Sequence, residues 1–417
     1  METKQTKVKV QYICPSCEHQ YLEENKTIGS FLSVEEISEG IAPKNAKCAV
    51  CKQKIGKICA KNEQNLFLSA INNPNLTVVV YTAPSIRTSL GEEFGLEAGT
   101  NVCGQMVKAI KTLGADYCFD MNFGADLTTI EETNELILRI KTGKNLPMLS
   151  SCCPAWVNFV ERAYPSIVKN LSTCKSPQQM MGAILTNYYA KKLGIEKTKL
   201  FVVSIVPCLA KKIEKIRDNQ KTEHGFDVDC TLTTSELAQL IKNAKIDFNG
   251  LKNAEFDNDF KLSSGAGTIF GNSGGVLEAI MRSAKNNIKN EINYNLIRGK
   301  RGVREIKVNI DGKEVWFACV SGLSLAKPLL DEIKAGRSKY SFIEVMACDG
   351  GCVGGGGQPQ PEDREEAVKA RASGLYDAML KNNFATSTDN TAIKELYKNY
   401  LGKIGGQKAC ALLHVKR

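Results

Sequence analysis

The sequence contains, at its positions 342–359, the stretch Phe342-Ile-Glu-Val-Met-Ala-Cys348-Asp-Gly-Gly-Cys352-Val-Gly-Gly-Gly-Gly-Gln-Pro359. Its opening residues form an apolar run that is typical of a buried strand. Six of the nine residues from 349 to 357 are glycine. A backbone without side chains can lie close against a ligand, and two cysteines four positions apart can direct both sulfurs at one metal centre. The stretch therefore predicts a strand that ends in a metal-binding loop, in preference to a flexible turn with incidental cysteines.

The composition is that of a soluble globular protein with more than one domain. The chain has 417 residues, of which 43% are hydrophobic and 24% charged, and a single core rarely grows to that size. The sequence contains no run of about 18 apolar residues, so we expect no membrane-spanning helix. The polar N-terminus lacks the apolar segment of a signal peptide, so we expect a cytoplasmic protein.

The cysteine content and the net charge indicate which kinds of site and which binding partners to expect. Sixteen cysteines favour metal sites over disulfides in a chain that is expected to be cytoplasmic. The excess of 55 Lys and Arg over 45 Asp and Glu gives a net charge of +10, which would attract an acidic redox partner as well as nucleic acid. Because no helix-turn-helix signal and no interleaving of basic with aromatic residues is present, we do not expect nucleic-acid binding.

Residues 1–70 predict a small metal-binding module. They contain two Cys-x-x-Cys motifs separated by 30 residues, and four thiolates in this pattern can close a tetrahedral site that takes the place of a sizeable core. The spacing resembles that of rubredoxin, which holds one iron, although Glu18 and Lys52 stand where rubredoxins usually have glycine. A rubredoxin-like iron site is slightly favoured, and a structural zinc ribbon stays open. The four cysteines are Cys14, Cys17, Cys48 and Cys51.

Strand-like runs alternate with helical segments through the rest of the chain. Residues 77–81 predict a strand, residues 128–140 predict a helix, and the β-branched run 200–206 predicts a buried strand of the parallel type. This alternation predicts an α/β fold of two lobes with a parallel sheet in each. We place the first lobe at 75–199 and the second lobe, with a C-terminal helical segment, at 200–417.

Cysteines occur where several of the predicted strands end. Ligand-binding loops of open α/β sheets follow the carboxyl ends of the strands, so two facing lobes would bring these cysteines to one cleft. Four thiolates are what a cubane 4Fe–4S cluster requires. Adjacent cysteines cannot comfortably ligate one metal together, so one of Cys152 and Cys153 is expected to be a ligand and the other a free thiol, in preference to a vicinal disulfide. The expected ligands are Cys153, Cys208, Cys348 and Cys352.

Three segments resemble the three signature motifs of FeFe-hydrogenases. They are Ser150-Ser-Cys-Cys-Pro-Ala-Trp156, Pro207-Cys-Leu-Ala-Lys-Lys-Ile-Glu214 and the stretch from Glu344 to Pro359 quoted above. The likeness runs from about residue 75 to the C-terminus. It implies an H-cluster, in which a 4Fe–4S cubane is joined through one cysteine sulfur to a two-iron unit carrying CO, cyanide and a bridging dithiolate amine. It also implies reversible oxidation of H₂, an acidic ferredoxin-like electron carrier and hydrogenase maturation proteins as partners.

The resemblance implies a role for each matching residue. Cys352 would bridge the cubane to the two-iron unit, and Lys211 would donate a charge-assisted hydrogen bond to a cyanide nitrogen. Spacing alone makes Glu132 and Glu135 a solvated pair on one helix face, whereas the resemblance puts both on a proton route. That route would consist of Cys152, Glu132, Ser172 and Glu135, and the surroundings of the two-iron unit would be Lys211, Pro84, Ser85, Gln178, Phe270, Val206 and Met346.

Two residues depart from the family pattern, and two other functions stay open. Val206 stands where the second motif usually has Met, which removes a sulfur contact near the two-iron unit, and Ser150 replaces a usual Thr. One alternative is a hydrogenase-like assembly or scaffold protein that holds only a cubane, but such relatives lack the counterparts of Cys152 and Lys211. The other alternative is a slow hydrogen sensor. Sensors tend to carry a signalling domain, and Val206 is the feature that keeps this alternative open.

Overall fold

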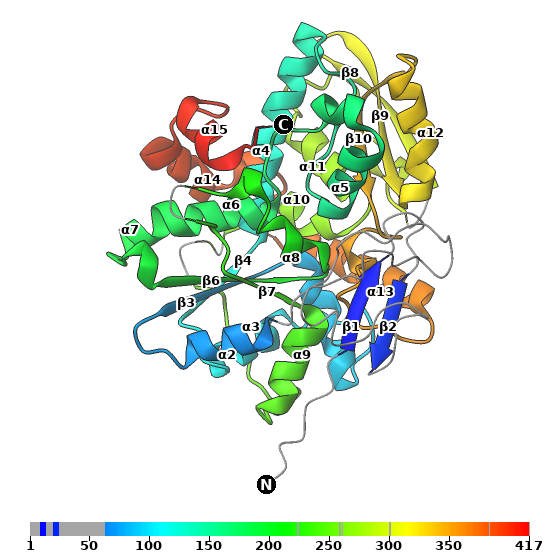
Figure 1. Cartoon of the computed structure of the whole chain (residues 1–417). Coiled ribbons are helices and arrows are strands. Elements are labelled where there is room, and N and C mark those ends of the chain that lie inside the picture. Colours follow the sequence, from blue (N-terminus) through cyan, green and yellow to red (C-terminus); the bar gives the residue numbers. More distant parts are fainter. Residues whose placement is uncertain are drawn as a thin grey trace.

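Two four-stranded sheets, with helices packed on their faces, form most of the described molecule (Figure 1). This computed structural model describes residues 63–416 except 223–224, 258–259, 261, 300–301 and 383, together with the backbone of 9–13 and 20–24. The latter two segments are β1 (Lys9–Ile13) and β2 (Gln20–Glu24), which pair with each other antiparallel. The predicted metal ligands Cys14, Cys17, Cys48 and Cys51 lie outside the described residues.

The first sheet is entirely parallel, with the order β4-β3-β6-β7. Its two central strands, β3 and β6, are almost continuously apolar and buried, as expected for strands that are covered on both faces. The predicted strands at 77–81 and 200–206 are therefore confirmed. The strands are β3 (Thr77–Thr82), β4 (Tyr117–Asp120), β6 (Leu200–Val206) and β7 (Cys230–Thr233).

The second sheet has the order β5-β10-β9-β8 and is mixed. β10 pairs parallel with both β5 and β9, whereas β8 pairs antiparallel with β9. The two-residue turn Asp311-Gly312 joins β8 to β9, and both of its residues have positive φ angles, as a tight hairpin turn requires. The strands are β5 (Met148–Leu149), β8 (Gly302–Ile310), β9 (Lys313–Ser321) and β10 (Tyr340–Met346).

The two sheets do not correspond to consecutive halves of the chain. β6, which we expected to begin the second lobe, pairs with β3 in the first sheet, and β5, which we expected in the first lobe, pairs with β10 in the second. The predicted boundary at 199/200 therefore does not separate the sheets. An apolar run indicates a buried strand, but its partner strand depends on contacts far along the chain, which periodicity does not encode.

The long helix α4 lies between the two cores and contacts α6, α10 and α11. Phe123 and Leu127 of α4 pack in the core of the first sheet, whereas Leu136 and Ile140 pack in the core of the second. No described helix has the length and apolar character needed to cross a membrane. The helices are α2 (Gln64–Ile71), α3 (Cys103–Thr112), α4 (Asn122–Thr142), α5 (Pro154–Ala163), α6 (Pro177–Ile184), α7 (Ala190–Lys192), α8 (Ala210–Glu214), α9 (Thr234–Asn243), α10 (Gly265–Thr268), α11 (Gly275–Ser283), α12 (Leu323–Lys334), α13 (Arg364–Leu380), α14 (Thr391–Leu396) and α15 (Gln407–Leu413).

Candidate active site

Cysteines from both sheets line one cavity of about 70 Å³. Cys208 follows β6 of the first sheet, whereas Cys153 and Cys348 follow β5 and β10 of the second. Cys352 reaches the same cavity from the glycine-rich loop, and Cys152, Lys211 and Met346 also line it. The structure therefore brings the four predicted cubane ligands together between the sheets.

The glycine-rich loop can lie against its neighbours only because it lacks side chains. A Cβ atom on Gly355 would lie 2.3 Å from the carbonyl oxygen of Pro207. Gly351 has a φ of +93°, and its Cβ would lie 2.6 Å from the backbone nitrogen of Ser273. The backbone of Gly357 donates a hydrogen bond of 2.8 Å to the Pro207 carbonyl. These contacts hold the loop against the segment that carries Cys208.

The four cysteine side chains lie in an arrangement that favours binding of a metal cluster. Burial, together with the nearby Cys153, raises the pKa of Cys208 to about 11. Burial and the neighbouring Cys153 and Cys208 raise the pKa of Cys352 to about 12. Four buried thiolates would repel one another without a cation between them, and thiolate ligands are what iron–sulfur clusters require. The donor set therefore fits a 4Fe–4S cubane.

Lys211 is held between the cavity and a buried carboxylate. Its Nζ atom donates hydrogen bonds of 2.9 Å to the backbone oxygen of Cys152 and to Glu214 Oε2. Burial works to lower the pKa of Lys211, but the Glu214 carboxylate outweighs it and raises that pKa above its usual value. Lys211 thus places a positive charge at the cavity wall, beside Cys152, whose thiol is free.

Glu214 is a site residue that sequence reasoning missed. Its Oε2 atom accepts hydrogen bonds from Ser176 Oγ at 2.8 Å and Gln178 Nε2 at 3.2 Å, in addition to the one from Lys211. The available signal was the spacing of three between Lys211 and Glu214, which brings the two side chains together on a helix. Glu214 therefore orients both Lys211 and Gln178.

The five other residues that were predicted to surround the two-iron unit do not themselves line this cavity. Gln178 donates to the backbone oxygen of Lys211 at 3.1 Å, and Phe270 packs in the same apolar cluster as Cys152 and Met346. Ser85 lies against Gly271, and its buried hydroxyl has no hydrogen-bond partner among the described residues. An unpartnered buried hydroxyl fits a polar ligand atom at that place. Pro84 and Val206 are also buried.

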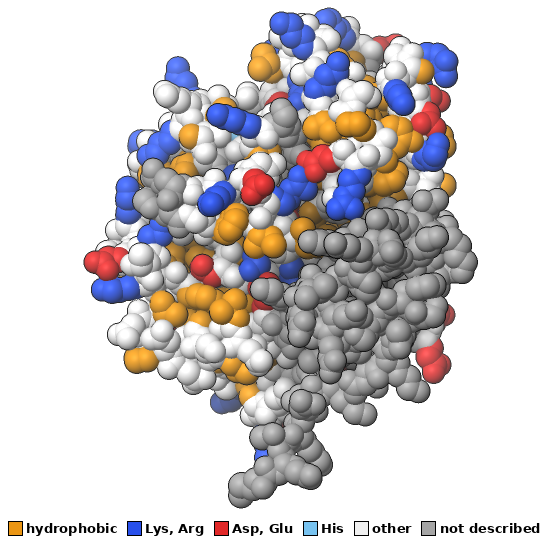
Figure 2. Space-filling model, in the orientation of Figure 1, with side chains coloured by type: hydrophobic (Ala, Val, Ile, Leu, Met, Phe, Trp, Pro, Cys, Tyr) orange, Lys and Arg blue, Asp and Glu red, His pale blue; other side chains and the backbone are white. Residues whose placement is uncertain are grey.

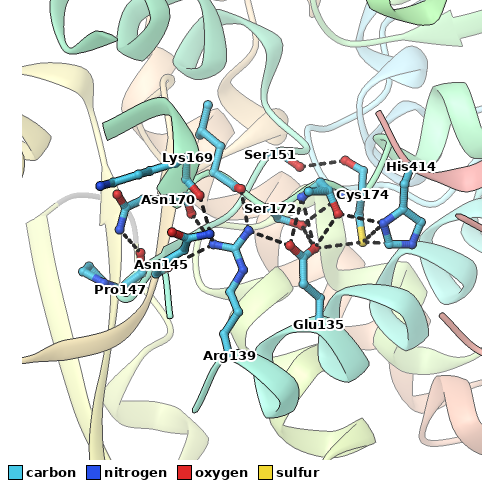
Figure 3. Close-up of polar contacts among 12 residues, drawn as sticks. Glu135, Arg139, Asn145, Pro147, Ser151, Lys169, Asn170, Ser172, Cys174 and His414 are labelled. Carbon is cyan, nitrogen blue, oxygen red and sulfur yellow. Dashed lines mark hydrogen bonds and ion pairs between the residues drawn. The ribbon is translucent and has the colours of Figure 1, made fainter. Parts of the chain in front are cut away.

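The predicted proton route lies along α4 and the segment that follows α5. Ser172 Oγ donates a hydrogen bond of 3.0 Å to Glu135 Oε2 (Figure 3). Glu132 is fully buried, and neither of its carboxylate oxygens has a hydrogen-bond partner among the described residues. Burial and the nearby Glu135 raise the pKa of Glu132 to about 8. Burial, followed by the charge of Glu132, raises the pKa of the Cys152 thiol well above its usual value.

The interpretation of Glu132 and Glu135 as a solvated surface pair is wrong. Glu132 is buried in α4, and Glu135 is largely buried, with Arg139 Nη2 2.6 Å from its Oε1 atom. Spacing on a helix indicates a shared face but not what covers that face, which here includes the segment around Ser172.

The sequence matches two family models along most of its length. Residues 76–356 match "Iron only hydrogenase large subunit, C-terminal domain", and residues 365–416 match "Iron hydrogenase small subunit". Iron hydrogenase 1 of Clostridium pasteurianum is 40% identical over 370 residues, which cover 87% of this chain and 64% of that protein. The NADP-reducing hydrogenase subunit HndD of Solidesulfovibrio fructosivorans is 43% identical over 357 residues, which cover 83% and 61%. The chain thus spans less than two thirds of the length of these two relatives.

Solved structures and a second group of relatives complete the comparison. The apo [FeFe]-hydrogenase HydA1 from Chlamydomonas reinhardtii superposes with a TM-score of 0.75 at 34% identity, covering 84% of this chain and 97% of that one. The cytosolic Fe-S cluster assembly factor narfl of Danio rerio is more distant, at 30% identity over 354 residues, which cover 81% of this chain and 85% of that protein. The family models, the sequence relatives and the shared fold agree that the chain belongs to the iron-only hydrogenase family.

Proposed function

We propose that the chain is an FeFe-hydrogenase that interconverts H₂ with protons and electrons at an H-cluster. The observation that carries this proposal is the presence of the free Cys152 thiol and Lys211 in the same cavity as the four predicted cubane ligands. A protein that only held a cubane would need the four ligands but neither of these two groups. When bound, the H-cluster supplies the H₂ chemistry at its two-iron unit and electron transfer at its cubane.

The residues of the chain supply cluster binding and proton transfer in this proposal. Cys153, Cys208, Cys348 and Cys352 would hold the cubane, and the Lys211 ammonium would donate to an anionic ligand of the two-iron unit. The Cys152 thiol would exchange protons with the cluster side of the cavity. Its raised pKa keeps the buried thiol in the neutral, protonated form.

Glu132 would take the next proton, and Ser172 and Glu135 would carry it toward the surface. With a pKa of about 8, Glu132 is largely protonated at neutral pH and can exchange its proton at little cost in free energy, as an efficient relay requires. Ser172 already donates to Glu135. Because Cys152 and Glu132 rest in their neutral forms, the buried part of the route holds no charge between proton transfers.

We further propose that electrons are exchanged with an acidic ferredoxin-like protein and that maturation proteins deliver the two-iron unit. The net charge of +10 supports the first part, because it favours encounters with a negatively charged partner. Lysine and arginine side chains are spread over the described surface on the face shown in Figure 2.

An infrared spectrum of the protein after maturation with the two-iron unit tests the proposed function. We expect sharp CO and cyanide bands that change under H₂, and no such bands from the same protein before maturation. Iron and sulfide in the amount of a single cubane, without these bands after maturation, would contradict the proposal. That outcome would favour an assembly role like that named for the Danio rerio relative.

A further inference from the structure

A second group of metal-binding side chains lies outside the cavity, at the outer end of the proposed proton route. Glu135 of α4, Cys174 and His414 each offer one ligand atom, and these three atoms lie within 4.8 Å of one another. Figure 3 shows the three side chains close together. Cys174 is fully buried, and the other two residues are partly buried. We propose that these three residues form a binding site for a divalent cation of the zinc class.

The distances among the three groups are close to those that zinc requires. Cys174 Sγ lies 3.7 Å from Glu135 Oε2 and 4.0 Å from His414 Nδ1. Tetrahedral zinc with bonds of about 2.3 Å to sulfur and about 2.0 Å to oxygen or nitrogen separates such ligands by about 3.5 Å. Movements of a few tenths of an ångström would therefore bring the sulfur to the required distance from the other two ligand atoms, which lie within 4.8 Å of each other. A thiolate, an imidazole and a carboxylate together favour zinc over magnesium or calcium, which prefer oxygen ligands alone.

His414 is oriented by a carboxylate, as metal-binding histidines usually are. Its Nε2 atom lies 3.1 Å from Oε2 of the fully buried Glu131. Glu131 is itself fixed by Tyr397, whose hydroxyl donates at 2.5 Å, and by the backbone nitrogen of Gly405 at 2.9 Å. When Nε2 donates its proton to Glu131, Nδ1 carries the lone pair that could bind a metal. The Thr173 hydroxyl lies 2.8 Å from Nδ1, so a metal at that atom would take the place of this contact. Glu131 and Glu135 are four residues apart on α4, so one helix face supplies both a ligand and the carboxylate that orients another.

Backbone hydrogen bonds hold Cys174 and His414 side by side, although the two residues are far apart in sequence. Cys174 and His414 form an antiparallel bridge, with hydrogen bonds of 2.8 Å from Lys175 to Leu413 and from Val415 to Thr173. The C-terminal segment is thereby fixed beside the loop that carries Cys174. The ligands need little ordering upon binding, which lowers the entropic cost of metal capture.

Both carboxylate oxygens of Glu135 have hydrogen-bond partners, and a metal would replace those of Oε2. Arg139 contacts Oε1 at 2.6 Å, whereas Oε2 accepts from Ser172 at 3.0 Å and from the Thr173 hydroxyl at 3.1 Å. The Thr173 backbone nitrogen also donates to Oε2, at 3.0 Å. A metal on Oε2 would compete with these three donors and release the Cys174 thiol proton to the solvent. It would occupy the oxygen atom that Ser172 contacts in the proposed proton route.

The test measures zinc binding to the matured full-length protein. Zinc sulfate is titrated in competition with a chromophoric chelator, and X-ray absorption at the zinc edge reports the ligands, since that edge is separate from the edge of iron. We expect the wild type to bind one more zinc than Cys174→Ala, with sulfur, nitrogen and oxygen ligands, and His414→Gln to bind at least about tenfold more weakly. The N-terminal cysteines are present in every variant, so their contribution cancels in the comparison.

Cys118→Ala is the matched control, because Cys118 is also a buried free thiol but lies in β4. It should bind zinc like the wild type. Equal zinc stoichiometry and affinity in the wild type, Cys174→Ala and His414→Gln would overturn the site.

Inhibition of turnover by zinc is a consequence that rests on the proposed function. Zinc should slow H₂ turnover in the wild type and Cys118→Ala, whereas Cys174→Ala should require at least about tenfold more zinc for the same fractional inhibition. If zinc binds with the expected ligands but turnover is unchanged, the metal site stands, and the place of Glu135 in the proton route is wrong. If the CO and cyanide bands are absent while the zinc site is present, only the proposed function fails.

Discussion

Single residues in the cavity separate cluster binding from proton transfer. Cys152 and Cys153 are neighbours in sequence, yet only Cys153 is assigned to the cubane, and the backbone oxygen of Cys152 is fixed by Lys211. Replacing the ligand Cys153 should therefore cause loss of the cluster. Replacing Cys152 should leave the cluster in place and stop proton transfer to it.

Cys152→Ala should keep the infrared bands of the matured protein and reduce H₂ turnover by at least about 100-fold, the scale of a lost proton-transfer group. Turnover can be measured as H₂ evolution with a reduced viologen, and the bands of the same sample confirm that the cluster is loaded. Cys118→Ala should retain the wild-type rate. Full turnover in Cys152→Ala would remove Cys152 from the proton route.

Glu132→Gln should change how stability depends on pH. The pKa of Glu132 is raised from 4.5 to about 8 in the folded protein, so the folded state holds a proton that the unfolded state has lost between these values. Stability contributed by this group is present below pH 4.5 and is lost as the pH rises toward 8, by at most about 1.4 kcal/mol per pH unit. Gln carries no such charge, so the variant should lose less unfolding free energy over this window.

The measurement is denaturant unfolding of the wild type and Glu132→Gln at several pH values between 5 and 8. Glu395→Gln serves as the control, because Glu395 is exposed in α14 and its change should leave the wild-type pH dependence in place. Parallel stability curves for the wild type and Glu132→Gln would show that Glu132 is ionised in the folded protein at neutral pH.

Among the elements, the glycine-rich loop joins the two sheets at the cavity. Its backbone bonds to Pro207 beside Cys208, and Arg371 of α13 donates to the carbonyls of Val353 and Pro359 at 3.0 and 2.8 Å. Arg371 is also paired with Glu92 at 2.6 Å. The loop therefore keeps its shape through contacts with α13, which follows it in sequence, and with the distant Pro207.

Gly355→Ala should destabilise this junction, because the added Cβ would meet the Pro207 carbonyl at 2.3 Å. We expect a loss of about 1–3 kcal/mol, as for other overpacked sites, and an iron content below that of the wild type. Thermal unfolding and iron analysis measure the two effects. Gly143→Ala is the control: Gly143 has a positive φ, unlike Gly355, whose φ is −64°. Nothing lies within 4 Å of the Gly143 Cβ position, so that variant should retain its iron.

Patterns in the sequence predicted the strands and the motif residues, but they did not predict which distant residues contact one another. The runs at 77–81 and 200–206 indicated strands because both are β-branched and apolar, and the cysteines followed from the spacing of their motifs. Glu214 and His414 were missed for different reasons. Glu214 has a local signal in its distance from Lys211, whereas His414 acquires its neighbours only when the chain folds back 240 residues to Cys174. Contacts of that range leave no trace in periodicity or composition.

For the molecule as a whole, the net charge predicts how the rate of electron exchange depends on salt. With a net charge of +10, electron exchange with an acidic ferredoxin should slow by about tenfold or more as salt rises from low to high concentration, because screening weakens steering. Stopped-flow oxidation of the reduced ferredoxin measures the rate. A cationic viologen as donor is the control and should show no such decline. A ferredoxin rate independent of salt would mean that charge does not guide this encounter.

The interleaved strand order also governs when the protein can take shape during its synthesis. β5 must wait for β10, about 190 residues later, before it has a partner strand. Throughout that interval on the ribosome, the adjacent thiols Cys152 and Cys153 have no second sheet to cover them. Because Cys352 is made later still, the four predicted cubane ligands exist together only near the end of synthesis. Oxidants therefore have their best access to Cys152 and Cys153 in the nascent chain.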